Sequence, residues 1–227
     1  MPGIMQTRYS FTAQFVRAGA FFANQARSLE DANPESASEE VVAEHRAYVV
    51  GAVMQCSAAL EAEIAEVVMH GPGHQLGTNG IDAAAHAYLE PLADVFENPP
   101  ILRKYEIVLH LLRRPPLDPG AVPYQSAALL IRLRNELVHY KSKVGPEMDR
   151  QALFTSLRQL GFARTPFESP STNFFPHHVL SASLASWSVT AAVGLMTEFY
   201  AKLGMESPLT PYMARLAVPP IIQAAAS

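Results

Sequence analysis

The sequence predicts an all-α fold, a bundle of four to five long helices with short peripheral helices. Apolar residues recur at intervals of three and four through most of the 227 residues, which is the period of an α-helix. No stretch of strand length alternates between apolar and polar residues between turn signals. Pairs of proline and glycine separate the helical stretches, so most of the connections are expected to be short.

The first part of the chain contains two predicted long helices. One covers residues 11–29. Ser36 and Glu39 match the capping box Ser-x-x-Glu, in which each residue satisfies a free backbone N–H of the first turn. A second helix is therefore predicted to begin there and to run to about His70, where the breaker run Gly71-Pro72-Gly73 ends it.

Five further helices are predicted in the rest of the chain. Asn98 is expected to cap a helix that carries Pro99-Pro100 in its first turn, because proline is tolerated there. Pro176 is expected to open the last long helix in the same way. The predicted ranges are 81–96, 101–113, 124–143, 150–160 and 176–203, with a loop at 161–175.

Composition limits the class of protein. With 49% hydrophobic residues, the chain can bury a substantial core. No break in composition divides it, so one helical domain is expected over residues 1–227, with a core at about 38–203, an N-terminal helix within 1–30 and a loose tail at 208–227. A single cysteine, Cys56, excludes an internal disulfide framework and a cysteine-rich zinc site.

The location of the protein is also predicted. The start of the chain has no apolar segment of signal-peptide type. Residues 179–197 carry no charge, but serines and threonines interrupt them. A buried core helix explains this composition better than a membrane span does. We therefore expect a soluble cytoplasmic protein that does not insert into membranes.

Charge is unevenly distributed along the chain. Residues 28–98 contain thirteen acidic residues and one basic residue, Arg46, whereas residues 103–143 contain eight basic and three acidic residues. The net charge of the whole chain is −4, which argues against a protein whose surface is covered with basic residues for binding duplex DNA. Two interpretations remain open. The two parts attract each other, or the basic part is a local site for a polyanion.

The most informative segment is the polar face of the predicted helix 124–143. At 100° per residue, several side chains fall on one polar arc, and residues four apart can touch. A basic residue, Arg134, falls instead on the apolar side, where an unpaired charge is costly. Glu61 lies in the apolar context Leu60-Glu61-Ala62 and is predicted to pair with Arg134. The arc consists of Arg132, Asn135, Glu136, His139 and Lys143.

This segment resembles a known family. Arg134-Asn135-x-x-x-His139 is similar to the Arg-x4-6-His motif of HEPN domains, with a polar residue after the arginine. The stretch Ala59-Leu60-Glu61-Ala62 and the late stretch from Phe175-Pro176 onward resemble helices of such bundles. The resemblance covers about residues 38–203. It implies an all-α HEPN-like bundle, commonly dimeric, and often a ribonuclease that uses neither a metal nor another cofactor.

The resemblance implies a function and a set of partners. RNA would be cleaved by a metal-independent endoribonuclease, with Arg134, Asn135 and His139 as catalytic residues. Arg132, Lys141 and Lys143 are expected to hold the RNA backbone. Two motifs meeting across a homodimer would form the site, and a toxin or antiphage role with an antitoxin or regulatory protein is implied. The alternative is a non-catalytic helical module for dimerisation, nucleotide sensing or protein interaction.

Four other histidines receive a weaker interpretation. His70 and His74 flank Gly-Pro-Gly, and without carboxylate or thiolate ligands nearby a solvated turn is favoured over a metal site. His177 and His178 follow Pro176 and, being adjacent, point in different directions on a helix. We therefore predict no metal site.

Overall fold

The computed structural model describes residues 10–70, 89, 91, 96, 98–139, 152–167 and 174–222. All the secondary-structure elements of this part of the chain are helices, which confirms the predicted all-α fold. The elements are α1 (Phe11–Ala32), α2 (Glu39–His70), α4 (Ile101–Leu111), α5 (Val122–Val138), α6 (Ala152–Gln159), the π-helical turn η4 (Phe174–His178), α7 (Ala182–Leu203) and α8 (Thr210–Leu216).

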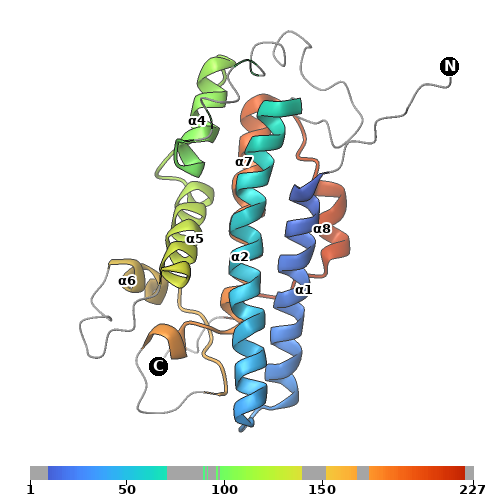
Figure 1. Ribbon diagram of the computed structural model, residues 1–227, viewed down its shortest axis with the longest axis vertical. Coiled ribbons are helices and arrows are strands. Elements are labelled where there is room, and N and C mark those ends of the chain that lie inside the picture. Colours follow the sequence, from blue (N-terminus) through green and yellow to red (C-terminus); the bar gives the residue numbers. More distant parts are fainter. Residues whose placement is uncertain are drawn as a thin grey trace, which may run out of the picture.

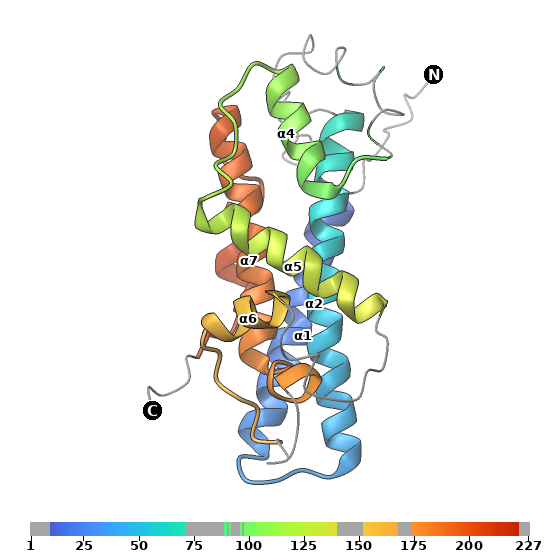
Figure 2. The ribbon, with the colours of Figure 1, turned by 90° about the vertical axis from the view of Figure 1, so that its left-hand side faces the viewer.

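Helices α1, α2 and α7 lie side by side along the long axis of the molecule. Helices α4 and α5 pack against α2 and α7 on the side away from α1 (Figures 1 and 2). The short connection between α1 and α2 makes these two helices antiparallel. In the second view, α5 crosses in front of both α7 and α2, with α6 below it. The C-terminal end of α5 is thereby brought beside α6.

Helix α2 begins at a different cap from the predicted one. The residue that caps it is Ser38, whose Oγ accepts a hydrogen bond from the N–H of Val41 at 3.3 Å. Glu39 is therefore the first residue of the helix rather than the third. The capping box of Ser36 with Glu39 is wrong, because the sequence offers two serines and the chain uses the second.

Helix α1 is capped by a side chain from another helix. Glu66 of α2 accepts hydrogen bonds from the backbone N–H groups of Phe11 and Thr12 and from the hydroxyl of Ser10. A carboxylate at a helix N-terminus satisfies free N–H donors and interacts favourably with the helix dipole. This contact joins the start of α1 to the far end of α2.

Helix α7 is the buried centre of the bundle. Two of its buried serines donate hydrogen bonds to the helix backbone: Ser186 Oγ donates to Ala182 O at 3.0 Å and Ser188 Oγ to Leu184 O at 2.9 Å. Such bonds satisfy a buried hydroxyl without a partner helix. The uncharged stretch is thus a core helix, as predicted. None of the helices in the described part of the chain has the length and apolar character that crossing a bilayer requires.

Two predicted helix boundaries are wrong. Helix α7 begins at Ala182, six residues after Pro176, because Phe175 has a non-helical backbone and Ser181 is the extended N-cap. Helix α4 ends at Leu111, since Arg113 adopts a positive φ of 54° and left-handed backbone ends a helix. Most of the predicted helix 81–96 lies outside the described residues, as does the end of the predicted helix 124–143.

Candidate functional site

The predicted polar arc lies at the C-terminal end of α5. Leu130 and Leu133 face the core and are wholly buried, whereas Arg132, Asn135 and His139 are exposed. The two sets separate because helical residues three and four apart share a face. Core packing of the leucines therefore holds the polar side chains toward solvent, and this part of the prediction is confirmed.

These side chains line a common hollow. It is formed by Arg132, Asn135, Glu136 and His139 on α5 together with Ala152 and Leu153 at the start of α6, and its volume is about 560 Å³. His139 is the C-cap of α5, with φ −103° and ψ 24°, and its N–H bonds to Asn135 O. The hollow brings together an imidazole, a guanidinium and an amide, which can move a proton and bind an oxyanion.

Arg134 does not line this hollow but acts on one of its residues. Its side chain is half-buried, and Nη1 donates a hydrogen bond to Asn135 Oδ1 at 3.0 Å. A guanidinium has only donors, so this bond fixes which end of the amide faces it. The Nδ2–H donors of Asn135 are then the groups that can be offered to a phosphate oxygen. Within the single chain, Arg134 thus contacts Asn135 rather than the hollow itself.

The predicted pair of Glu61 and Arg134 is not formed. Glu61 is exposed, and the ion pairs of the described residues do not include it. The buried carboxyl of α2 is Glu63, which accepts a hydrogen bond from the hydroxyl of Tyr200. Leu60, Glu63, Ile64 and Val67 share the face of α2 that meets the core, and Glu61 falls outside it.

A tyrosine beside Glu63 carries a perturbed pKa. Burial, with the negative charges of Glu63 and Glu66 added, raises the pKa of Tyr105 well above its usual value. Its hydroxyl therefore stays protonated and donates to Leu60 O at 2.8 Å. This bond joins α4 to α2 inside the core, and Tyr105 is not among the residues that line the hollow on α5.

Several other predicted residues lie outside the described part of the chain. Lys141 and Lys143 belong to this group, as do the side chain of His70 and the whole of His74. Their proposed roles on RNA or in a turn stay predictions. The described ranges contain no group of three or more His, Cys, Asp or Glu side chains arranged to hold a metal ion.

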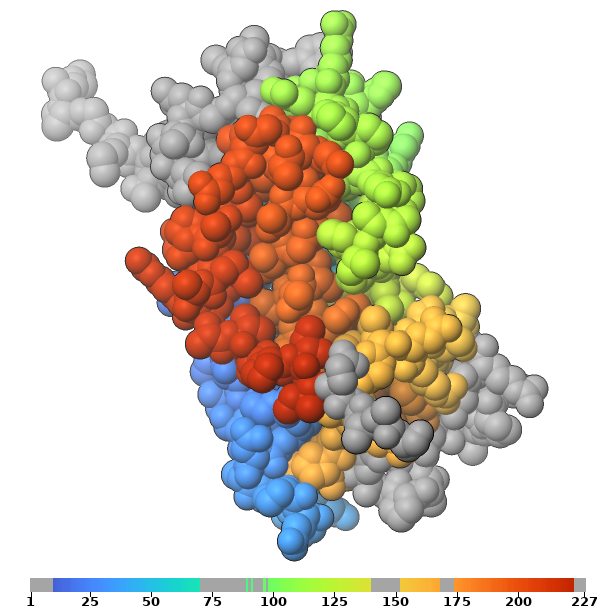
Figure 3. Space-filling view, turned by 180° about the vertical axis from the view of Figure 1, so that it is seen from behind, coloured from blue at the N-terminus to red at the C-terminus, as the bar shows by residue number. Residues whose placement is uncertain are grey.

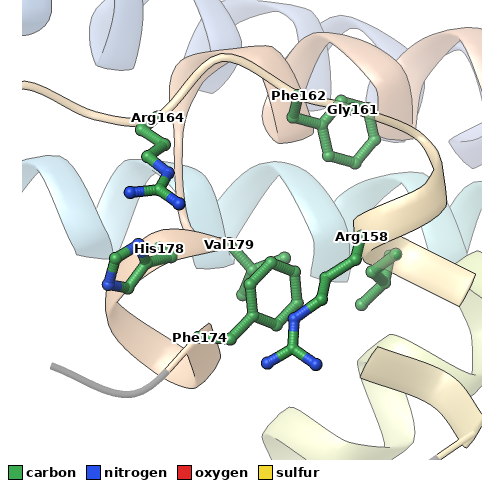
Figure 4. Close-up of a pocket in the computed structure, with 8 residues that line it drawn as sticks. Arg158, Gly161, Phe162, Arg164, Phe174, His178 and Val179 are labelled. Carbon is green, nitrogen blue, oxygen red and sulfur yellow. The ribbon is translucent and has the colours of Figure 1, made fainter. Parts of the chain in front are cut away.

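The two adjacent histidines after Pro176 have separate surroundings. His177 Nδ1 lies 2.8 Å from Nη2 of Arg46. Burial and the positive charges of Arg46 and His178 lower the pKa of His177, so the neutral ring can accept this hydrogen bond. His178 turns instead into a pocket beside α6 (Figure 4).

Sequence reasoning missed that second pocket. It is lined by residues from α6, from the loop that follows and from η4 onward: Leu157, Arg158, Gly161, Phe162, Arg164, Phe174, His178 and Val179. The signal in the sequence is the alternation of arginine and phenylalanine on both sides of Gly161, but the loop carries no helical period that would place these side chains together.

Comparison with family models, with curated proteins and with solved structures found no match for this chain.

Proposed function

We propose that this protein is a metal-independent endoribonuclease and that the hollow on α5 is its active site. The observation that carries the proposal is the shared placement of His139, Asn135 and Arg132 around one open hollow. These three side chains supply a proton-transfer group, an orienting amide and a phosphate-binding cation. Two of the three motif residues that suggested RNA chemistry, Asn135 and His139, thus lie at a concave surface.

The chemistry needs no metal ion. The 2′-hydroxyl of RNA attacks the adjacent phosphorus, the bond to the 5′-oxygen breaks, and a 2′,3′-cyclic phosphate forms. The imidazole of His139 is the group that would accept the 2′-hydroxyl proton. Arg132 can hold two phosphate oxygens with its planar fork, which stabilises the charge that develops in the transition state. The Nδ2–H donors of Asn135 add a further hydrogen bond to that phosphate.

The departing 5′-oxygen needs a proton from a second group. We propose that a homodimer supplies it, with His139 of each copy facing the other across the two-fold axis. A dimer would also double the arginines near the substrate, including the pair Arg132 and Arg134. Any toxin or antiphage role, with an antitoxin or regulatory protein, rests on the resemblance to HEPN domains alone.

The test is cleavage of a mixed RNA pool by the purified protein in EDTA. Fragments ending in 2′,3′-cyclic phosphate are expected from the unmodified chain, and His139→Ala should cut the rate by about 10²-fold or more, because general acid–base catalysis contributes that much. His110→Ala is the matched control, since His110 is an exposed histidine on α4. Light scattering on each sample checks the oligomeric state.

A second candidate is a non-catalytic module that binds a helical partner or a nucleotide. The observation that favours it is Glu136, a carboxylate that lines the same hollow and would repel an RNA phosphate. Absence of cleavage by a folded dimer, or equal cleavage by wild type and His139→Ala, would contradict the ribonuclease and favour this module.

A further inference from the structure

The hollow on α5 contains a carboxylate that the cleavage chemistry does not use. Glu136 is half-buried and lines the hollow together with Arg132, Asn135 and His139. A carboxylate repels the phosphate that Arg132 and Asn135 would hold, so its role on RNA lies away from the cleaved phosphate. Its two oxygens are hydrogen-bond acceptors. The groups of a nucleotide that suit Glu136 are therefore the N–H donors of a base.

Helix spacing places Glu136 between the two groups that act on the phosphate. Arg132 lies four residues before it and His139 three residues after it. At 1.5 Å per residue, these separations are about 6 Å and about 4.5 Å along the helix axis. Residues three and four apart are neighbours on a helix surface. The base of the nucleotide whose 2′-hydroxyl reaches His139 would thus come close to Glu136.

Helix α6 supplies a second, apolar wall. Its first two residues, Ala152 and Leu153, line the hollow, and Leu153 is buried. Seen from behind, α6 (yellow) adjoins the end of α5 (yellow-green) at one side of the molecule (Figure 3). The volume of about 560 Å³ is within the usual range for small-molecule sites. The face of a base can therefore lie against α6 while its polar edge points to α5.

Guanine is the RNA base that matches both oxygens of a carboxylate. Its Watson–Crick edge presents N1–H and the N2 amino group side by side, and both are donors. Adenine and cytosine place a ring-nitrogen acceptor beside their amino group, and uracil places N3–H between two carbonyl acceptors. An acceptor that faces a carboxylate oxygen forms no hydrogen bond and leaves that oxygen unsatisfied. Unpaired RNA exposes this edge to side chains.

We propose that Glu136 makes the enzyme selective for guanosine at the nucleotide that carries the attacking 2′-hydroxyl. Oε1 and Oε2 would accept hydrogen bonds from N1–H and from the N2 amino group, and such charge-assisted bonds are strong. Arg132 and Asn135 hold the phosphate, and His139 moves the proton. This inference rests on the ribonuclease function proposed above and names its substrate. Glu136 is a specificity-determining residue in this site.

Mapping of fragment ends tests the selectivity. The unmodified chain is incubated with single-stranded RNA of random sequence in EDTA, and the bases that carry the 2′,3′-cyclic phosphate are identified by sequencing. Guanosine is expected there in at least about tenfold excess over each other base, because hydrogen bonds to a charged acceptor are worth that much. Inosine keeps N1–H and lacks the N2 amino group. Replacing the guanosine of one short RNA by inosine should lower kcat/KM by about tenfold.

Glu136→Gln changes the pattern of donors and acceptors at nearly constant shape. The amide presents one acceptor and one donor, which matches the edges of adenine and cytosine. The excess of guanosine ends should disappear, and the share of adenosine and cytidine ends should rise. Glu61→Gln is the matched control, since Glu61 is exposed on α2 and is not among the residues that line the hollow. Its guanosine preference should equal that of the unmodified chain, and circular dichroism shows that both variants are folded.

The two proposals fail in different ways. No cleavage by the folded, unmodified chain would overturn the ribonuclease and this selectivity with it. Cleavage that His139→Ala abolishes, but that leaves the four bases in equal shares at the cyclic phosphate, would overturn the selectivity alone. An unchanged guanosine excess in Glu136→Gln would overturn it too. So would an equal loss of cleavage at all four bases in that folded variant, because Glu136 would then not read the base.

Discussion

Glu30 is the buried carboxylate that joins three helices. It lies in the last part of α1 and is 7% exposed. Oε1 accepts hydrogen bonds from His45 Nε2 of α2 at 3.0 Å and from the N–H of Ala182, the first residue of α7, at 2.9 Å. Oε2 accepts from Arg27 Nη1 at 3.1 Å. A buried carboxylate is tolerated here because both of its oxygens are satisfied.

The first stability prediction belongs to this residue. Glu30→Ala should lower the free energy of unfolding by about 3–5 kcal/mol, because it leaves buried donors of His45 and Ala182 without an acceptor. Glu61→Ala is the matched control on a solvated acid and should change stability by less than about 0.5 kcal/mol. Urea unfolding followed by circular dichroism measures both. Similar small losses for the two variants would contradict the role of Glu30.

At the scale of elements, α1 and α2 meet through a glycine. A Cβ added at Gly19 would lie 2.6 Å from Sγ of Cys56, and Cys56 is fully buried. The missing side chain therefore sets how closely the two helices approach. Gly194 of α7 is different, since a Cβ there would meet Pro123 Cβ at 3.9 Å, an ordinary contact.

These two glycines should respond to alanine with opposite signs. Gly194→Ala should stabilise the protein by up to about 1 kcal/mol through helix propensity. Gly19→Ala should destabilise it by about 1–3 kcal/mol, because the gain in propensity is smaller than the cost of overpacking. The loss should shrink in a Cys56→Ala background, and a double-mutant cycle in urea measures that coupling. Additive effects would show that the steric contact is unimportant.

At the scale of the whole molecule, the ion pairs identified between described residues do not join the acidic part of the chain to the basic part. These ion pairs of arginine or lysine with glutamate lie within single helices: Arg27–Glu30, Arg103–Glu106 and Lys202–Glu198. The link between α4 and α2 is the hydrogen bond of Tyr105 to a backbone carbonyl. Apolar burial in one core cluster joins the two parts.

Cys56 offers a probe of that core as a unit. It is the single cysteine of the chain, and burial raises the pKa of its thiol. A raised thiol pKa favours the folded state at neutral pH, and this contribution is lost as pH rises above the ordinary thiol pKa of about 8.5. At pH 8 the native thiol is both neutral and covered.

We therefore expect a disulfide reagent to label Cys56 at pH 8 at least about 10³-fold more slowly in the native protein than in urea, since labelling requires the core to open. Gly19→Ala should label faster in proportion to its loss of stability. Rapid labelling of the native wild type, monitored by absorbance, would show that α1 separates from α2 without global unfolding.

Periodicity in the sequence was sufficient to predict the helical class, the extents of α1 and α2 within a few residues, the buried character of α7 and the polar arc on α5. Each of these depends on the spacing of neighbours along one helix, which the chain carries locally. The arc of Arg132, Asn135 and His139 could be predicted because all three lie on one element.

Tertiary packing decided the remaining features. Which carboxylate of α2 is buried depends on how that helix is rotated against α7, and a shift of two residues exchanges Glu61 for Glu63. The Glu30 network combines segments far apart in the chain, and the pocket of Arg164, Phe174 and His178 combines α6, the loop after it and η4. Contacts between distant segments are set by how the helices pack, and the spacing of residues within one segment carries no information about them.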